Sequence, residues 1–101
     1  MSYIKPQDVL APKDTIKSVS VLFDGGEYDD TDPWRGWSVA EIEEHSGLRR
    51  RIGVRWNGNQ SDADPSIGHP SGMGHATWFF VPSPLESIIS AIAKLGARLK
   101  A

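Results

Sequence analysis

Hydrophobic and polar residues alternate most clearly in residues 17–24, KSVSVLFD, where Val19, Val21 and Phe23 share one parity. An alternation with a period of two predicts a β-strand with one buried face. The next residues, GGEYDDTDP, combine two Gly and a Pro with acidic side chains and predict a surface loop.

Residues 37–58, WSVAEIEEHSGLRRRIGVRWNG, are compatible with two structures. Ser38 and Glu41 match a helix capping box, and Gly47 could end such a helix. The alternative is a β-hairpin that turns at residues 45–47. In its register the facing pairs are Ala40 with Ile52, Ile42 with Arg50, Glu41 with Arg51 and Glu43 with Arg49, and Val54 and Trp56 continue the inward parity. Because this one register accounts for both the apolar and the charged positions, we predict the hairpin.

Residues 75–82, HATWFFVP, form the most hydrophobic predicted strand, because residues 78–81 leave no polar face. Such a strand must be covered on both sides. One cover is a helix that begins at Ser83, with Pro84 at its first position and Glu86 completing a capping box. Its apolar stripe lies at helical spacing and comprises Leu85, Ile88, Ile89, Ile92 and Leu95. The other cover is either the sheet curling on itself or a second copy of the chain.

We therefore predict a single α+β domain over residues 1–101: a small, strongly curved, half-barrel-like antiparallel sheet of about four strands with one C-terminal helix. The predicted parts are an N-terminal arm at 1–16, the sheet at 17–82 with a long loop at 57–75, the helix at 83–95 and a loosely held tail at 96–101 after Gly96. A loop of that length in a small domain is usually functional or disordered.

Composition narrows the function classes. The 101 residues contain no Cys, which excludes disulfides and thiolate metal sites, while four Trp and three Phe supply large buried area for packing. A net charge of −2 provides no overall basic field that would attract nucleic acid. No apolar run approaches the roughly 20 residues of a membrane span, and the first residues lack the apolar core of a secretory signal, so we expect a cytoplasmic protein.

The segments RIGVRWNG and ATWFFVP resemble an uncharacterised family of small bacterial proteins. Its members pair an RWNG strand end with a TWFxxP strand across a loop of Gly, Pro and Ser, and they are often encoded in mobile gene cassettes. The preceding LFDGG and WSVAEIE are also similar, so the resemblance covers residues 18–82. It implies a strand at residues 37–43 and a shared loop, but no activity. The stretch NQSDADPSI departs from the family pattern in this loop.

The strand ends RWNG and HATW should lie at the same end of an antiparallel pair, which brings together indoles, amides and a guanidinium. We therefore expect a ligand-binding pocket with an apolar floor and a few convergent donors, formed by Arg55, Trp56, Asn57, Asn59, Ser71, His75 and Trp78. The aromatic segment PWRGW predicts a partner-binding surface at Trp34, Arg35 and Trp37, and with it a homodimer. These features favour a non-enzymatic module that binds a small ligand or a protein, with no catalytic residue, metal or cofactor.

Two alternatives use other residues of the chain. His69 and His75 with Asp62 or Asp64 offer ligands for a small metal-dependent or His-based hydrolase, although this set is incomplete for a tetrahedral site. The run Arg49–Arg51, with Arg35, offers cations for phosphate groups and would make the protein nucleic-acid-associated. The predicted hairpin neutralises two of these arginines, so nucleic acid is the less favoured partner.

Overall fold

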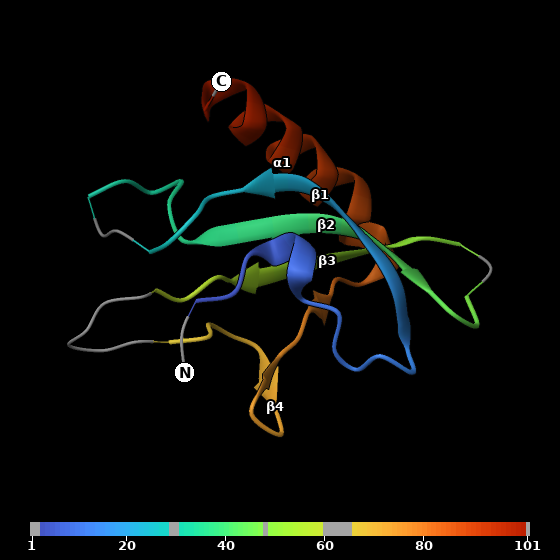
Figure 1. Cartoon of the computed structure of the whole chain (residues 1–101). Helices are drawn as coiled ribbons and strands as arrows, with labels where there is room; N and C mark the ends of the chain where they lie inside the picture. Colours follow the sequence, from blue (N-terminus) through green and yellow to red (C-terminus); the bar gives the residue numbers. More distant parts are fainter. Residues whose placement is uncertain (1–2, 29–30, 48, 60–65, 101) are drawn as a thin grey trace.

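The computed structural model describes residues 3–28, 31–47, 49–59 and 66–100. A four-stranded antiparallel sheet in the order β1-β2-β3-β6 forms its centre, with the C-terminal helix α1 behind the sheet and the N-terminal arm in front (Figure 1). This confirms the predicted α+β fold with one helix. The strands of the sheet are β1 (Ile16–Asp24), β2 (Trp37–Glu44), β3 (Arg51–Trp56) and β6 (Phe79–Phe80).

β2 and β3 form the predicted hairpin, so this segment is strand and not helix. The predicted register is wrong by one residue, because Ala40 pairs with Gly53, Glu41 with Ile52 and Ile42 with Arg51. A shift of one residue reverses the face of every side chain on a strand. Val54 consequently packs on the side of α1, whereas Ala40 and Ile42 belong to the core on the side of the arm.

The packing at Gly53 explains this register. A Cβ on Gly53 would lie 2.5 Å from Cδ1 of Ile42 and 3.2 Å from Cβ of Trp78, so these two side chains occupy the space that a larger residue would need. β2 is apolar on both faces, since Val39 and Ile42 are fully buried in different clusters. Alternation along β2 was therefore compatible with either register.

Three arginines follow the turn of the hairpin. Their ion pairs with carboxylates differ from the predicted ones. Arg50 contacts Glu41 at 3.1 Å and Arg51 contacts Glu44 at 3.8 Å, in place of the predicted Glu41–Arg51 pair. Arg49 contacts Glu86 at the start of α1 at 2.8 Å, in place of Glu43. The one-residue shift in register and the nearby helix account for both changes.

Residues 57–75 were predicted to form one long loop, and the described part of this segment is paired over much of its length. Isolated bridges join Trp56 to His69 and Asn59 to Ser66. Two short strands, β4 (Ser71–Gly72) and β5 (His75–Ala76), form a hairpin that projects below the sheet in Figure 1. Residues 60–65, within NQSDADPSI, lie outside the described residues.

The N-terminal arm supplies the second cover of the sheet. A 3₁₀ turn, η1 (Pro6–Asp8), leads into Val9, which is 2% exposed and whose carbonyl accepts a hydrogen bond of 2.9 Å from the indole N–H of Trp78. The arm-side core comprises Val9, Ile16, Ala40, Ile42, Ala76 and Trp78. This face is therefore covered by the chain's own arm. The two covers predicted for it were the sheet curling on itself and a second copy of the chain.

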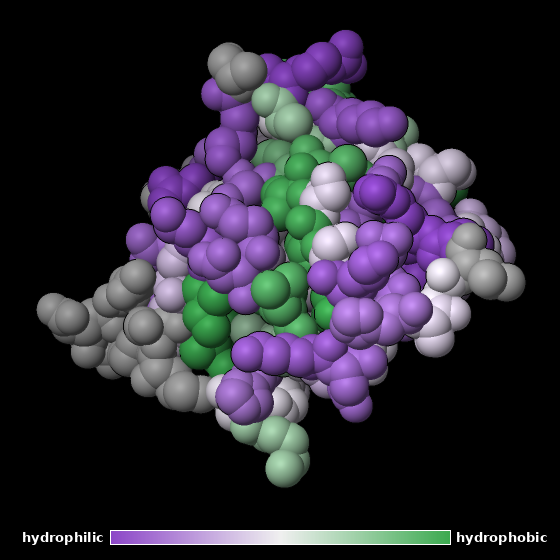
Figure 2. Space-filling view, turned by 45° about the vertical axis from the view of Figure 1, so that its right-hand side comes forward, coloured by the Kyte–Doolittle hydropathy of each residue, from purple (hydrophilic) through white to green (hydrophobic). Residues whose placement is uncertain are grey.

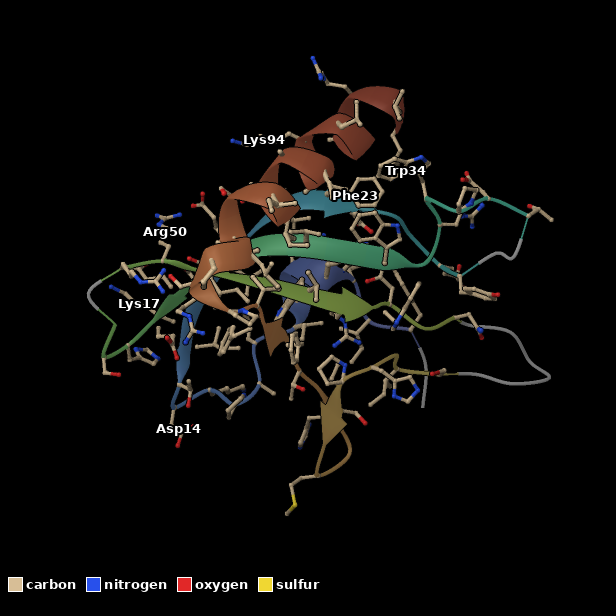
Figure 3. All side chains as sticks on the ribbon, turned by 180° about the vertical axis from the view of Figure 1, so that it is seen from behind. Asp14, Lys17, Phe23, Trp34, Arg50 and Lys94 are labelled. Atoms are coloured by element: carbon tan, nitrogen blue, oxygen red, sulfur yellow. The ribbon has the colours of Figure 1, made fainter. Side chains whose placement is uncertain are left out.

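α1 (Glu86–Lys100) follows a second 3₁₀ turn, η2 (Ser83–Leu85), and covers the other face. The helix was predicted to end before Gly96, and this prediction is wrong, because α1 continues to Lys100. A Cβ on Gly96 would lie 2.6 Å from Cζ3 of Trp34, so this glycine allows a close approach of the helix to the indole. Figure 3 shows Trp34 and Phe23 beneath this part of α1.

The helical stripe that faces the sheet also differs from the prediction. Ile89, Ala93 and Ala97 pack into the helix-side core with Phe23, Val39, Ile52 and Val81. By contrast, Leu85, Ile88, Ile92 and Leu95 are exposed. Mostly small residues face the sheet because the aromatic rings of Phe23, Trp34 and Trp37 already fill the space beneath the helix.

Glu86 fastens the start of α1 to β3. Its carboxylate accepts a hydrogen bond of 3.2 Å from the backbone N–H of Ile52 and one of 2.8 Å from Arg49. Desolvation acts to raise the pKa of Glu86, but the hydrogen bonds from Ile52 and Arg49 and the charges of Arg49 and Arg51 outweigh it, so the pKa is lowered.

We expect Glu86→Gln to destabilise the protein at neutral pH and to have less effect in acid. A carboxylate whose pKa is lower in the folded than in the unfolded state stabilises the fold above the unfolded pKa, and this contribution is lost as the pH falls through the folded pKa. Urea unfolding of wild type and variant at pH 7 and at about pH 3 measures both differences. The control is Glu41→Gln at the exposed pair with Arg50, which should change little at either pH. An equal loss for Glu86→Gln at both pH values would contradict this role.

Candidate functional site

α1 crosses its face of the sheet diagonally (Figure 3). At its start, Glu86 contacts the backbone of Ile52 near the beginning of β3; at its end, Lys100 donates a hydrogen bond to the carbonyl of Asp24 at the end of β1. β1 and β3 both run antiparallel to β2 and therefore point in the same direction. The diagonal helix thus leaves uncovered the corner of the sheet at which β3 ends.

A groove with a volume of about 810 Å³ opens at this corner. We call it the apolar groove. The residues that line it are Pro33, Trp34, Trp37, Val54, Arg55, Trp56, His69, Pro70, Phe79, Ile89 and Ile92. Trp56 is 56% exposed and Phe79 is 55% exposed, so two large aromatic rings of the groove are open to solvent. Their exposure is unusual because most large apolar side chains that face a sheet's covered side are buried.

Stacked aromatic rings form one side of the apolar groove. The rings of Trp34 and Trp37 stack with their centroids 5.6 Å apart, and Phe23 meets Trp37 at 4.8 Å and Trp34 at 5.7 Å. Gly96 of α1 approaches Trp34 from above. Because packed rings have few alternative rotamers, this side is a preformed surface.

Arg55 holds the opposite, loop-facing side in place. Its side chain is 3% exposed, and its guanidinium donates hydrogen bonds to the carbonyl oxygens of Ile67, Pro70 and Thr77. Burial lowers the pKa of Arg55 to about 10, which is still well above 7, so Arg55 is a cation at neutral pH. In the part of the chain that the structure describes, no carboxylate forms an ion pair with Arg55. The three carbonyls therefore stabilise its charge, and Arg55 acts as a clamp on residues 67–77.

Asn57 and Asn59 connect the loops on either side of β3. Asn57 is completely buried; its Nδ2 donates to the carbonyl of Gly26 and its backbone N–H to the carbonyl of Gly36, both at 2.7 Å. The backbone of Asn59 pairs with that of Ser66 in both directions at 3.0 Å. Neither asparagine lines the apolar groove, although both were predicted as ligand-binding residues.

The apolar groove combines residues from both predicted surfaces. Arg55 and Trp56, expected in the ligand pocket, and Trp34 and Trp37, expected at the partner surface, all line it. Arg35, the third residue of the expected partner surface, is exposed outside the groove, and its Nε donates to the carbonyl of Glu27 at 3.1 Å. The structure therefore brings residues of both predicted surfaces together in one groove.

Trp78, Ser71 and His75 do not join this site. β3 and β6 are paired, as expected, and Trp56 and Trp78 lie at the same end of the sheet. However, the pairing of Val54 with Phe79 places Trp56 on the helix side, whereas Trp78 belongs to the arm-side core. Ser71 and His75 are exposed on the β4–β5 hairpin. The structure therefore does not bring the seven predicted residues together, since neighbouring residues of a strand point to opposite faces.

Phe79, Ile89 and Ile92 line the groove, although their hydrophobic patterns predict core positions. The alternation of side chains along a strand could have identified Phe79. Trp78 and Phe79 are neighbours, so only one of them can point to the arm side, and the other must point to the helix side. The helix offered no comparable signal, because its apolar residues extend over more than one face.

The residues of the two alternative functions are placed as follows. His69 lines the apolar groove and His75 lies on the hairpin, while Asp62 and Asp64 are outside the described residues. Within the described ranges, no three His, Asp or Glu side chains are grouped so that they could share a metal ion. Arg49, Arg50 and Arg51 each pair with a carboxylate. The hydrolase and the nucleic-acid hypotheses both stay predictions.

Comparison of the chain with protein-family models, with curated proteins and with solved structures finds no match. The resemblance to proteins of mobile gene cassettes therefore also stays a prediction. None of the helices in the described part of the chain is long and apolar enough to span a membrane.

Proposed function

We propose that the protein is a non-enzymatic binding module whose apolar groove takes a small apolar or aromatic molecule. The observation that carries this proposal is the open aromatic surface of Trp56 and Phe79 inside a groove of about 810 Å³. Small-molecule sites in proteins have volumes of about 300–1,000 Å³ and are mostly lined by apolar side chains. The groove fits this description in both size and lining.

Energetics support an apolar ligand. Covering roughly 100 Å² on each exposed ring would contribute about 2–3 kcal/mol per ring, before the cost of association. The stacked Trp34–Trp37 pair offers a flat surface for an aromatic ring of the ligand. His69 at the rim can exchange a hydrogen bond with a polar substituent of the ligand.

The proposal is tested with the neutral fluorescent probe N-phenyl-1-naphthylamine, followed by its own emission and by quenching of tryptophan fluorescence. We expect saturable binding to the wild-type protein and at least a tenfold higher Kd for Trp56→Ala, because the loss of one stacking ring costs about 1.4 kcal/mol or more. Trp56 is half exposed, so the variant should remain folded, as circular dichroism would verify.

The matched control is Met73→Ala, because Met73 is 98% exposed at the tip of the β4–β5 hairpin, away from the apolar groove. This variant should bind the probe with the wild-type Kd. Absence of saturable binding to the wild type, or an equal loss in both variants, would contradict the proposal.

The proposal keeps two expectations from the sequence: a cytoplasmic location and a gene carried on a mobile element. Fractionation of cells that express the protein tests the first. Inspection of the flanking genes for recombination sites tests the second.

A further inference from the structure

α1 carries a second apolar stripe that does not face its own sheet. The stripe begins at Leu85, the last residue of η2, and continues in α1 with Ile88, Ile92, Leu95 and Leu99; these five residues are between 40% and 62% exposed. Their spacing alternates between three and four residues, which is the heptad pattern of a helix that pairs with another helix. We call these five residues the α1 seam. Sheet packing does not require it, because Ile89, Ala93 and Ala97 already perform that task.

We propose that the α1 seam is a homodimer interface in which α1 pairs with the α1 of a second copy of this chain. A single heptad stripe is complementary to itself, because leucine and isoleucine side chains of one helix fill the spaces between those of the other. A two-fold axis places the same stripe on both partners and closes the assembly at two copies. This inference goes beyond the ligand-binding function and does not depend on it.

The available apolar area matches a dimer. The five seam residues are each about half exposed. Taking a large side chain as about 200 Å², they offer on the order of 500 Å² of apolar surface per chain, close to the non-polar share of the roughly 800 Å² per partner of a standard interface. α1 is already folded on its sheet, so pairing costs no helix formation.

Charge favours an antiparallel pair. The first turn of α1 contains Glu86, whereas its last two turns contain Lys94, Arg98 and Lys100. A parallel pair would place the two basic ends side by side, whereas an antiparallel pair separates them and sets the two helix dipoles in opposite directions. Ile92 belongs to both the seam and the apolar groove, so the partner helix adds a further wall to the groove.

The opposite flank of α1 provides a matched control. Ser87 and Lys94 are exposed there, about 80–180° around the helix from the individual seam residues. Apolar side chains are also exposed away from α1, at Leu10 and Met73. Figure 2 shows a band of hydrophobic residues flanked by hydrophilic ones on the side that it turns forward. The variants must therefore distinguish the seam from other apolar surfaces.

Size-exclusion chromatography with light scattering and sedimentation equilibrium of the full chain test the dimer. We expect twice the mass of one chain, with a Kd on the order of 1 µM or below. Ile88→Lys and Leu95→Lys should each raise this Kd at least tenfold, whereas Ser87→Lys should leave it unchanged. Because Ile88 and Leu95 are exposed, both variants should keep the wild-type circular dichroism spectrum.

A monomeric wild type over the whole concentration range overturns the proposal, as does a dimer that Ile88→Lys and Leu95→Lys leave intact. Co-sedimentation of a monomeric chain with vesicles of phosphatidylcholine and phosphatidylglycerol would assign the seam to a lipid surface instead, and would also overturn it. The ligand proposal is judged separately, because its readout is probe binding by Trp56→Ala.

The orientation is tested by cross-linking, which is specific because the chain has no Cys. In an antiparallel pair, residue 85 of one copy lies beside residue 99 of the other. The two residues 85 are then about 21 Å apart, as are the two residues 99, which is beyond the reach of bismaleimidoethane. The double variant Leu85→Cys/Leu99→Cys should therefore form a covalent dimer, and each single variant should not. Cross-linking of both single variants would overturn the antiparallel arrangement.

Discussion

Replacing Arg55 with methionine is expected to lower the free energy of unfolding by about 3 kcal/mol. Methionine keeps much of the apolar stem but leaves the carbonyls of Ile67 and Thr77 without the guanidinium donor, whereas the carbonyl of Pro70 keeps the hydrogen bond from the backbone N–H of Thr77. Hydrogen bonds to a charged group contribute about 1.5–3 kcal/mol each, and the desolvation of the buried guanidinium offsets part of their sum. Urea unfolding followed by tryptophan fluorescence measures the loss.

The control for the Arg55 clamp is Arg50→Met. Arg50 is exposed and pairs with Glu41 at the surface, where an ion pair contributes at most about 1 kcal/mol. Hydrogen exchange adds a local readout, since Arg55→Met should expose the amides of residues 67–77 before those of β1 and β2. Equal destabilisation by the two substitutions would show that Arg55 is not a special anchor.

Gly68→Ala is expected to destabilise the protein by about 3 kcal/mol or more, through the same region. Gly68 has a φ of +84°, which costs a residue with a side chain about 1–2 kcal/mol. Its Cβ would also lie 1.9 Å from the carbonyl oxygen of Trp56 and 2.7 Å from Nη2 of Arg55. The backbones of Trp56 and His69 exchange two hydrogen bonds here, at 2.7 and 2.9 Å. Because the clash is with this paired backbone, the backbone must shift to accept the Cβ.

Gly72→Ala is the matched control, because it is the same substitution in the same segment and its Cβ would meet no atom within 4 Å. We expect a change within about 0.5 kcal/mol for this variant. Gly68→Ala should also weaken binding of N-phenyl-1-naphthylamine, since His69 and Pro70 line the apolar groove. If both alanine variants unfold at the wild-type urea concentration, the close approach at Gly68 does not contribute to the free energy of unfolding.

The fold was largely predictable because its elements have local signals. The alternation around Val21 marked β1, and the opposite charges flanking the turn at residues 45–47 marked the β2–β3 hairpin. The register was not predictable in the same way, since β2 is apolar on both faces and the space beside Gly53 is filled by Ile42 and Trp78, which is a tertiary arrangement. The predicted helix end at Gly96 was wrong for a similar reason. Gly96 allows a tertiary contact with Trp34, which no local sequence pattern reveals.

The site was only partly predictable because it depends on what the helix leaves uncovered. Trp34, Trp37 and Trp56 were recognised as candidates from their aromatic character, and they line one groove. That these residues lie together follows from the diagonal path of α1 between Ile52 and Asp24, which is a property of the assembled fold. Asn57 was also recognised, but its amide is used to connect two loops.

The contact between Val9 and Trp78 has a consequence for the order of folding. The two residues are 69 positions apart, so this hydrogen bond closes a loop that contains the whole of β1, β2 and β3. Contacts of such large sequence separation form slowly, because the entropy of loop closure must be lost before they contribute. During synthesis on a ribosome, the arm therefore stays unpaired until Trp78 has left the exit tunnel, and the face formed by Ala40 and Ile42 stays exposed to water until then.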